Sequence, residues 1–482
     1  MEHQGENYTE ALATFASKST YEDIPAEVIH QTKRLILDTI GCALGGYTTD
    51  KGRIARALVK RLGGKPESTV IGSGDKTSCS NAAFANANMT NALDNDDTFM
   101  NMAHFANHAV QAALAVGETT NAGGKEVINA VVLGYDIAGR VVSSTGGFWI
   151  RTEEGKIRIQ RGFGFGWQVL AAAIAAGKIF NFDEEQMYHT IGIAGSMGPV
   201  GSLAKWFEPP LPLVKYGDAG WTVQAGVVGA MLAQEGYTGY HAILDGDLGF
   251  WRMYGADECD FSVLTGQMGK KWYIMDSSFK PWPSCRFTHQ PLTIFIALMK
   301  EHSIKPEEIE KVIIKGSGMT TEPVFLSPEP SPGPIGPQFS GSHVMAMAAY
   351  GIPPGPEWQR PELVDDPKIR RFRERVTIER DKELFKDMAR QVPGLLKRVP
   401  TTIEVSAGGK LFSKSGEYAK GDPWLAETRM TDDELRDKFR CNAAGVLTTS
   451  LTWRRQIEEV MEMVYRLEEV KCVSELVKLL VA

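Results

Sequence analysis

Two segments of the chain consist almost wholly of small and aliphatic residues. They are Gln168–Gly177 (QVLAAAIAAG) and Gln224–Ala233 (QAGVVGAMLA). Helices that are apolar on every face are buried nearly all round, and small side chains let neighbouring helices approach closely. These segments therefore predict a large and tightly packed helical core.

Helical patterns continue on both sides of these segments and return at the end of the chain. Asp23 and Pro25 are typical of a helix start, and Gly45–Gly46 of its end. After residue 423, Thr431 and Glu434 have the spacing of a capping box, and Arg454–Leu480 has an amphipathic pattern. Both chain ends are therefore expected to be helical.

The middle of the chain has a different pattern. A helix is expected over Thr293–His302, and the strand-like pieces are Lys311–Lys315, Arg375–Glu379 and Thr402–Val405, the last with a hairpin through Gly408–Gly409 to Lys410–Phe412. The segment Pro323–Pro337 is rich in proline and glycine and is expected to be a loop.

This order predicts a mainly α protein with two domains. Residues 1–275 and 428–482 would form a large all-helical domain from both chain ends, and residues 276–427 a smaller α+β domain that acts as a lid. Length alone suggests three domains, at about 150 residues each. The cleft between the two expected domains is the default place for a site.

Charge and composition exclude several classes of function. The net charge is −7 and no long basic run is present, so nucleic acid and anionic membranes are not expected partners. The N-terminus lacks the pattern of a signal peptide, and no apolar stretch approaches 18 residues, which predicts a cytoplasmic protein. Six scattered cysteines without a CxxC pair indicate reduced thiols rather than disulfides or a zinc site.

The densest group of chemically able residues is Asp94–Thr98, followed by His104 and His108, in a stretch expected to be helical. Paired carboxylates can hold Mg²⁺ as terpene synthases do, but Met100 and Asn101 stand where a DDxxD pattern continues, and no second metal motif follows. No metal site is predicted. The alternative without chemistry is a solvated helix end.

Two lysines stand at positions that favour anion binding. Lys215 precedes Asp218, a predicted N-cap for the helix that starts near Gly220, and helix N-termini attract anions. Lys280 and Arg286 bracket a loop stiffened by two prolines at the predicted domain junction. Either lysine alone is more often a solvated surface charge.

Three further features have a structural as well as a functional interpretation. Positive neighbours could lower the pKa of Cys285, but no His and acid partners for a thiol nucleophile are apparent, which favours a packed thiol. His289 begins an apolar segment and is more often a helix-start or core histidine. Gly162–Gly166 and Gly72–Thr77 lack the spacing of nucleotide-binding loops and are interpreted as turns.

Four segments together resemble the MmgE/PrpD family over nearly the whole chain: Leu35–Cys42, Leu93–Thr98, Lys280–His289 and Asp437–Phe439. The family includes 2-methylcitrate dehydratase, cis-aconitate decarboxylase and iminodisuccinate epimerase. The resemblance implies a helical domain with an α+β lid, a homodimer, and chemistry on small di- or tricarboxylates without metal or organic cofactor.

The resemblance also implies roles for individual residues. Asp94, His104, Lys215 and Lys280 match catalytic positions, and Thr98, Arg286, Cys285 and His289 are assigned to substrate binding.

Two features set the chain apart from the known branches. Gly164 stands where the decarboxylase branch has a histidine, which argues against cis-aconitate decarboxylation. Ala204–Pro210 is bulkier than in the dehydratases, which indicates a different substrate.

The expected reaction is therefore that of a hydro-lyase. Loss of water from a 3-hydroxy acid needs a base at the α-carbon, cations for the enediolate-like charge, and an acid for the leaving hydroxyl. His104 is assigned to proton transfer, and Lys215 and Lys280 to carboxylate binding or acid/base work. The alternatives are an isomerase or epimerase, a cis-aconitate-type decarboxylase, and a ligand-binding protein without catalysis.

Overall fold

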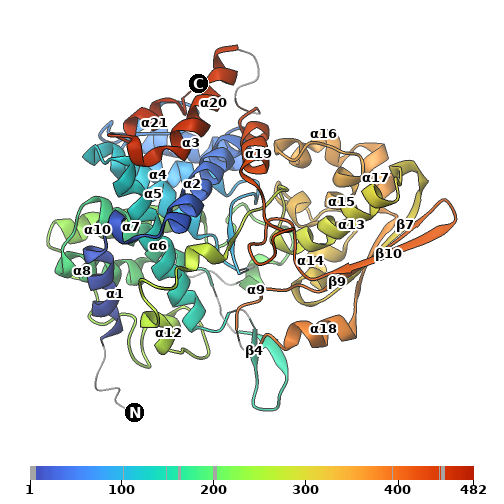
Figure 1. Ribbon diagram of the computed structural model, residues 1–482, viewed down its shortest axis with the longest axis horizontal. Helices are drawn as coiled ribbons and strands as arrows, with labels where there is room; N and C mark the ends of the chain where they lie inside the picture. The colour runs from blue at the N-terminus through green and yellow to red at the C-terminus, as the bar shows by residue number, and fades with distance from the viewer. Residues whose placement is uncertain are drawn as a thin grey trace.

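The computed structural model describes residues 7–481 except 101, 148, 161–163, 199–202, 393, 445 and 447–450. Part of the glycine motif at 162–166 lies outside the described residues. Most helices of the two chain ends gather on one side of the molecule, and a four-stranded sheet with its helices lies on the other (Figure 1). The mainly α fold class is confirmed.

The helical part consists of helices from both chain ends and three two-stranded sheets, so it is not strictly all-helical. The sheets pair β1 (Ser68–Thr69) with β2 (Lys76–Thr77), β3 (Thr98–Phe99) with β6 (Ser277–Ser278), and β4 (Trp149–Arg151) with β5 (Ile157–Ile159). The helices are α1 (Tyr8–Lys18), α2 (Ala26–Gly46), α3 (Asp50–Leu62), α4 (Cys79–Thr90), α5 (Phe105–Thr120), α6 (Gly124–Ser144), α7 (Gln168–Ile179), α8 (Glu184–Met197), α9 (Leu203–Trp206), α10 (Ala219–Gln234), α11 (Phe250–Met253), α12 (Ser262–Thr265), α19 (Asp432–Ala444), α20 (Leu451–Tyr465) and α21 (Ser474–Lys478).

The small-residue segments pack as their composition predicts. Helix α7 contacts α5, α6 and α10, and it is buried from Gln168 to Gly177. A Cβ atom added to Gly226 of α10 would lie 2.7 Å from the Cβ of Ala172, and one on Gly134 of α6 would lie 2.4 Å from the carbonyl oxygen of Ala171. Larger side chains at these positions would push the helices apart, so glycine and alanine set the spacing of the core.

Both chain ends belong to this helical part. Helix α19 packs against α2, where a Cβ on Gly41 would come within 2.8 Å of the ring of Phe439. The capping box at the start of α19 is confirmed, because the Thr431 hydroxyl accepts from the Glu434 amide and the Glu434 carboxylate accepts from the Thr431 amide. The amphipathic run over 454–480 is divided between two helices: α20 ends at Tyr465, and a 3₁₀ turn precedes α21.

The middle of the chain forms a sheet with the order β10-β9-β7-β8 and its helices. Strand β7 (Ile309–Gly316) pairs parallel with β8 (Val376–Arg380) and antiparallel with β9 (Thr401–Ala407), which forms the expected hairpin with β10 (Lys410–Gly416). The positive φ angles of Gly408 and Gly409 allow the tight turn. The helices are α13 (His289–Glu301), α14 (Pro323–Leu326), α15 (Gly341–Ala349), α16 (Pro361–Val364), α17 (Pro367–Arg373) and α18 (Lys382–Ala389).

The buried apolar side chains form two clusters, and the two-domain division stays a prediction. One is formed by the helical part, and the other by the sheet with α13, α15 and α17. The first cluster also includes Phe325 and Phe339, which come from the middle of the chain. The expected loop at 323–337 is partly wrong, since α14 and the beginning of a 3₁₀ turn at Gly336 lie within it. The exact domain boundaries stay a prediction.

Helix α6 departs from the expectation that no apolar stretch approaches 18 residues. Among the described residues it is the one helix long and apolar enough to cross a membrane by length and composition. Its apolar window is 94% buried inside the protein, which is the arrangement of a core helix.

Candidate active site

The acidic segment Asp94–Thr98 is buried and is not helical. It follows the end of α4, and Asp94, Asp96 and Asp97 are at most 1% exposed. Asp94 has a φ of +53°, a left-handed conformation that aspartate tolerates better than most residues. The expected helix and the alternative of a solvated helix end are both wrong.

Lys280 and Lys215 converge on the carboxylate of Asp94. The Nζ of Lys280 donates to Oδ1 of Asp94 at 2.6 Å and to its carbonyl oxygen at 3.0 Å, while the Nζ of Lys215 lies 3.8 Å from the same Oδ1. All three side chains are fully buried. Strand pairing explains part of this arrangement, because Thr98 in β3 pairs with Ser278 in β6, two residues before Lys280.

The electrostatics of this group favour an ionised Asp94 and bring the pKa of Lys215 closer to neutral pH. Burial by itself raises the pKa of Asp94, but the positive charges of Lys215, Lys280 and His104 outweigh it and lower the pKa below its usual value. Burial lowers the pKa of Lys215 to about 8, although Asp94 opposes this shift. Lys215 can therefore exchange a proton near physiological pH.

His104 lies at the start of α5 and is oriented by Asp96. Its Nδ1 is 3.3 Å from Oδ2 of Asp96, and its backbone amide donates to Oε1 of Gln168 at 2.9 Å. Burial raises the pKa of Asp96, but a positive charge on the neighbouring His104 outweighs it and holds that pKa well below its usual value. A carboxylate beside Nδ1 favours the tautomer with its proton on that nitrogen, and in that tautomer Nε2 is the unprotonated nitrogen.

Tyr216 was not among the residues expected from the sequence. Its hydroxyl donates to Oδ2 of Asp94 at 3.0 Å, and its ring stacks on that of His104 with centroids 4.7 Å apart. The ring of Trp206 packs against the ring of Tyr216, with centroids 5.2 Å apart. The bulky segment around residue 206 therefore forms a wall of the site. The sequence could have indicated Tyr216 as a site residue, because it directly follows Lys215.

Gln338 is a second residue that sequence reasoning missed. Its Oε1 accepts from the Nζ of Lys215 at 3.0 Å, and its Nε2 donates to the carbonyl of Ala92 at 2.7 Å. It thus connects the middle part of the chain to the helical part at the site. Thr98 is also buried here, and among the described residues its hydroxyl has no hydrogen-bond partner.

The side chains of Cys285 and His289 are buried close to the cluster. Burial favours the neutral thiol and the neutral imidazole. Burial raises the pKa of Cys285 to about 12, contrary to the lowered pKa considered from the sequence, so a thiolate is disfavoured. Burial and the charge of Arg286 lower the pKa of His289 well below its usual value. His289 begins α13, as the structural interpretation expected.

Arg286 forms an ion pair with Asp422, which also accepts from the hydroxyl of Ser278 at 2.7 Å. This pair holds Arg286 at the junction between the two parts of the chain. The substrate-binding roles of Thr98, Arg286, Cys285 and His289 stay predictions.

A metal ion fits this site poorly. Among the described residues, Asp94, Asp96 and His104 have ligand atoms within 4.8 Å of one another. A divalent cation there would face the ammonium groups of Lys280 and Lys215 at close range, and like charges repel strongly in a buried site. The two lysines already neutralise the carboxylates.

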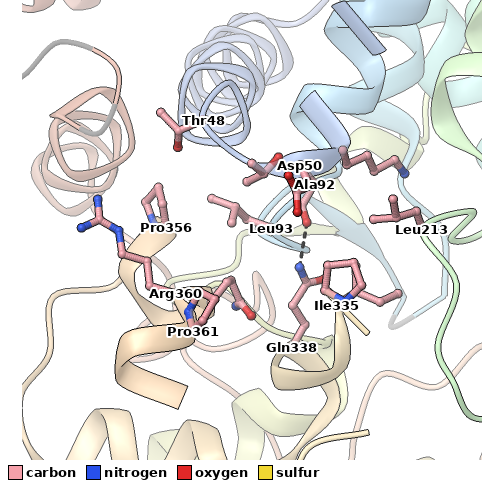
Figure 2. Close-up of a pocket in the computed structure, with 14 residues that line it drawn as sticks. Thr48, Asp50, Ala92, Leu93, Leu213, Ile335, Gln338, Pro356, Arg360 and Pro361 are labelled. Carbon is pink, nitrogen blue, oxygen red and sulfur yellow. Dashed lines mark hydrogen bonds between the residues drawn. The ribbon is translucent and has the colours of Figure 1, made fainter. Parts of the chain in front are cut away.

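A cavity of about 370 Å³ opens next to this cluster. Figure 2 shows Thr48 and Asp50 on one side of it, Pro356, Arg360 and Pro361 on the other, and Gln338 bonded to Ala92 between them. The cavity therefore lies between the helical part and the middle part, where a cleft was expected, and Gln338 joins it to Lys215.

The chain is similar to known proteins over nearly its whole length. Residues 10–261 match the family model of the MmgE/PrpD N-terminal domain, and residues 282–463 match that of the MmgE/PrpD C-terminal domain. The chain is 24% identical to the cis-aconitate decarboxylase-like protein oryM of Aspergillus oryzae, with 98% of this chain and 97% of the relative covered. It is 24% identical to human cis-aconitate decarboxylase (98% and 94% covered) and 22% identical to that of Aspergillus terreus (98% and 95% covered).

Proposed function

Because the chain belongs to the MmgE/PrpD family, we propose that it is a cofactor-independent lyase that acts next to a carboxylate of a small di- or tricarboxylic acid. The observation that carries this proposal is the convergence of Lys215 and Lys280 on Asp94 in a buried site. Fixed cations in a site without bulk water stabilise an enediolate far better than water does.

Dehydration is the first candidate reaction. The Nε2 of His104 takes the α-proton, the electron pair moves into the new double bond, and the C–O bond breaks as the hydroxyl leaves. Lys215, with a pKa of about 8, gives a proton to that hydroxyl so that it leaves as water. Lys280 and Tyr216 hold Asp94, and Asp96 holds His104.

Decarboxylation is the second candidate, and the names of the relatives favour it. In that reaction a C–C bond breaks, CO₂ leaves, the electron pair remains on the carbon skeleton, and a proton is added to carbon. Gly164, which is buried and has no side chain, argues against it, because the decarboxylase branch has a histidine there. The third candidate is an epimerase, in which the proton returns on the other face.

Product analysis separates these reactions. The purified protein is incubated in deuterated water with hydroxy-, unsaturated and amino-substituted di- and tricarboxylates and followed by proton NMR. Interconversion of a hydroxy acid and an alkene identifies a hydro-lyase, release of CO₂ a decarboxylase, and exchange at the α-carbon without another product an epimerase. Binding in a thermal-shift assay without any of these would contradict an enzymatic role.

The assembly and location are part of the same proposal. We propose a homodimer, which the family resemblance implies, and a cytoplasmic location. Helix α10 exposes Trp221 and Met231, which are 55% and 36% accessible. Exposed apolar side chains on one helix suit an interface. Light scattering of the purified protein measures the oligomeric state.

A further inference from the structure

Lys51 is a buried lysine that the reaction described above does not use. It stands in the first turn of α3, whose N-cap is Thr49, and the residue is 6% exposed. Among the described residues its Nζ has no hydrogen-bond partner. Within the part of the chain that the structure describes, the carboxylate in ion-pair range is that of Asp218, 3.9 Å away.

Asp218 is a weak partner for Lys51. Its Oδ1 accepts from the Trp221 amide at 3.1 Å and caps α10, which draws on the charge of the carboxylate. Burial lowers the pKa of Lys51 more than Asp218 raises it. Among the described residues, the ammonium group of Lys51 therefore has N–H donors without acceptors, and burying unsatisfied donors is unfavourable.

Lys51 lines the cavity beside the catalytic cluster. Gln338 lines the same cavity and accepts from Lys215, and the charge of Lys51 contributes to the lowered pKa of Lys215. A ligand in the cavity can touch Lys51 and Gln338, and Gln338 in turn accepts a hydrogen bond from Lys215. The helix N-terminus at Lys51 adds a favourable potential for an anion.

We propose that Lys51 binds a second carboxylate of the substrate, one that lies away from the reacting carbon. This inference rests on the proposed function, since it assigns the cluster of Lys215 and Lys280 to the first carboxylate. The acid that lines the cavity, Asp50, is exposed and is paired with Arg53 at 3.1 Å. The substrate class is therefore a di- or tricarboxylate whose carboxylates are separated along the carbon chain.

Binding of an unreactive probe tests this role apart from catalysis. Propane-1,2,3-tricarboxylate has neither a hydroxyl group nor a double bond, so calorimetry measures its affinity without turnover. Lys51→Met is expected to weaken that affinity by about tenfold or more, which is the usual effect of losing a charge-assisted hydrogen bond. The affinity for butanoate, which has one carboxylate, is expected to stay within twofold.

A matched control is Lys60→Met, which removes the same charge from an exposed position on α3. It is expected to leave both affinities within twofold. Affinity for the tricarboxylate within twofold in Lys51→Met, or an equal loss for butanoate, would overturn the proposal. The ion pair of Lys51 with Asp218 is long, so its removal should not unfold the protein. Lys51→Gln provides the same test if Lys51→Met is not recovered folded.

The outcome for Lys51 is distinguishable from that for the proposed function. If the wild-type protein turns over no carboxylate and Lys51→Met still weakens tricarboxylate binding, the lyase proposal fails and the role of Lys51 stands. If a di- or tricarboxylate is turned over with unchanged KM by Lys51→Met, the lyase proposal stands and the role of Lys51 fails.

Discussion

The ammonium group of Lys438 donates to the carbonyl oxygen of Asn95 at 2.7 Å, although the two residues are 343 positions apart in the sequence. The same group pairs with Asp38 of α2 at 2.5 Å. Asn95 lies between Asp94 and Asp96, so the C-terminal helix α19 fixes the backbone that carries both site carboxylates. Lys438, which belongs to the segment 437–439 that resembles the family motif, thus positions the backbone of the site in this protein.

Loss of Lys438 should weaken the whole fold. Burial disfavours its charge, but Asp38 outweighs this and raises the pKa of Lys438. Lys438→Met leaves Asp38 as an uncompensated buried charge and is expected to lower the free energy of unfolding by about 3–5 kcal/mol. Denaturant unfolding measures this. Lys300→Met, an exposed change on α13, should cost less than about 1 kcal/mol. Asp38→Leu combined with Lys438→Met should cost less than the sum of the single changes.

His104 and Lys280 should be needed for turnover. His104→Ala and Lys280→Ala are each expected to lower kcat by about a hundredfold or more, because one removes the proton acceptor and the other a cation at the developing charge. Steady-state kinetics with circular dichroism separates this from unfolding. Lys300→Ala, an exposed change on α13, is the control. Near-normal turnover in both site variants would contradict the proposed roles.

Lys215 should give the rate a pH dependence near pH 8. Burial lowers its pKa to about 8, and the proposed acid is the protonated form. The value of kcat/KM is therefore expected to fall as pH rises through about 8, and Lys215→Met should lose both this limb and most of the activity. A wild-type rate that instead rises through pH 8 would identify Lys215 as a base rather than an acid.

Tyr216→Phe should distinguish the role of the Tyr216 hydroxyl group from that of its ring. The ring still stacks on His104, but Oδ2 of Asp94 loses its donor at 3.0 Å. A buried acceptor left unsatisfied costs about 1–3 kcal/mol, and kcat is expected to fall about tenfold or more with little change in KM. Tyr254→Phe removes a buried hydroxyl that donates to the Gly198 carbonyl, and it should lower stability without this loss of kcat. Equal kinetic effects of both variants would argue against a specific role for Tyr216.

Local sequence patterns predicted most elements well. The start of α2, the Asp218 cap of α10, the capping box of α19 and the β9–β10 hairpin were all expected, because caps and turns depend on residues three or four positions apart. The helix expected around Asp94 was wrong. Its alanine- and asparagine-rich surroundings continue a helical pattern, but long-range pairing of β3 with β6 replaces the helix there.

The sequence by itself determined that the core is helical and closely packed, because the small residues of α7 and α10 let neighbouring helices approach closely. The sequence also determined which residues carry acidic, basic or nucleophilic side chains. Tertiary structure alone decided that Asp94 is buried between two lysines, that Tyr216 and Gln338 complete the site, and that Lys51 faces the cavity. Their partners lie more than a hundred residues away, and a local pattern reports which face of an element is apolar but not which distant charge will meet it.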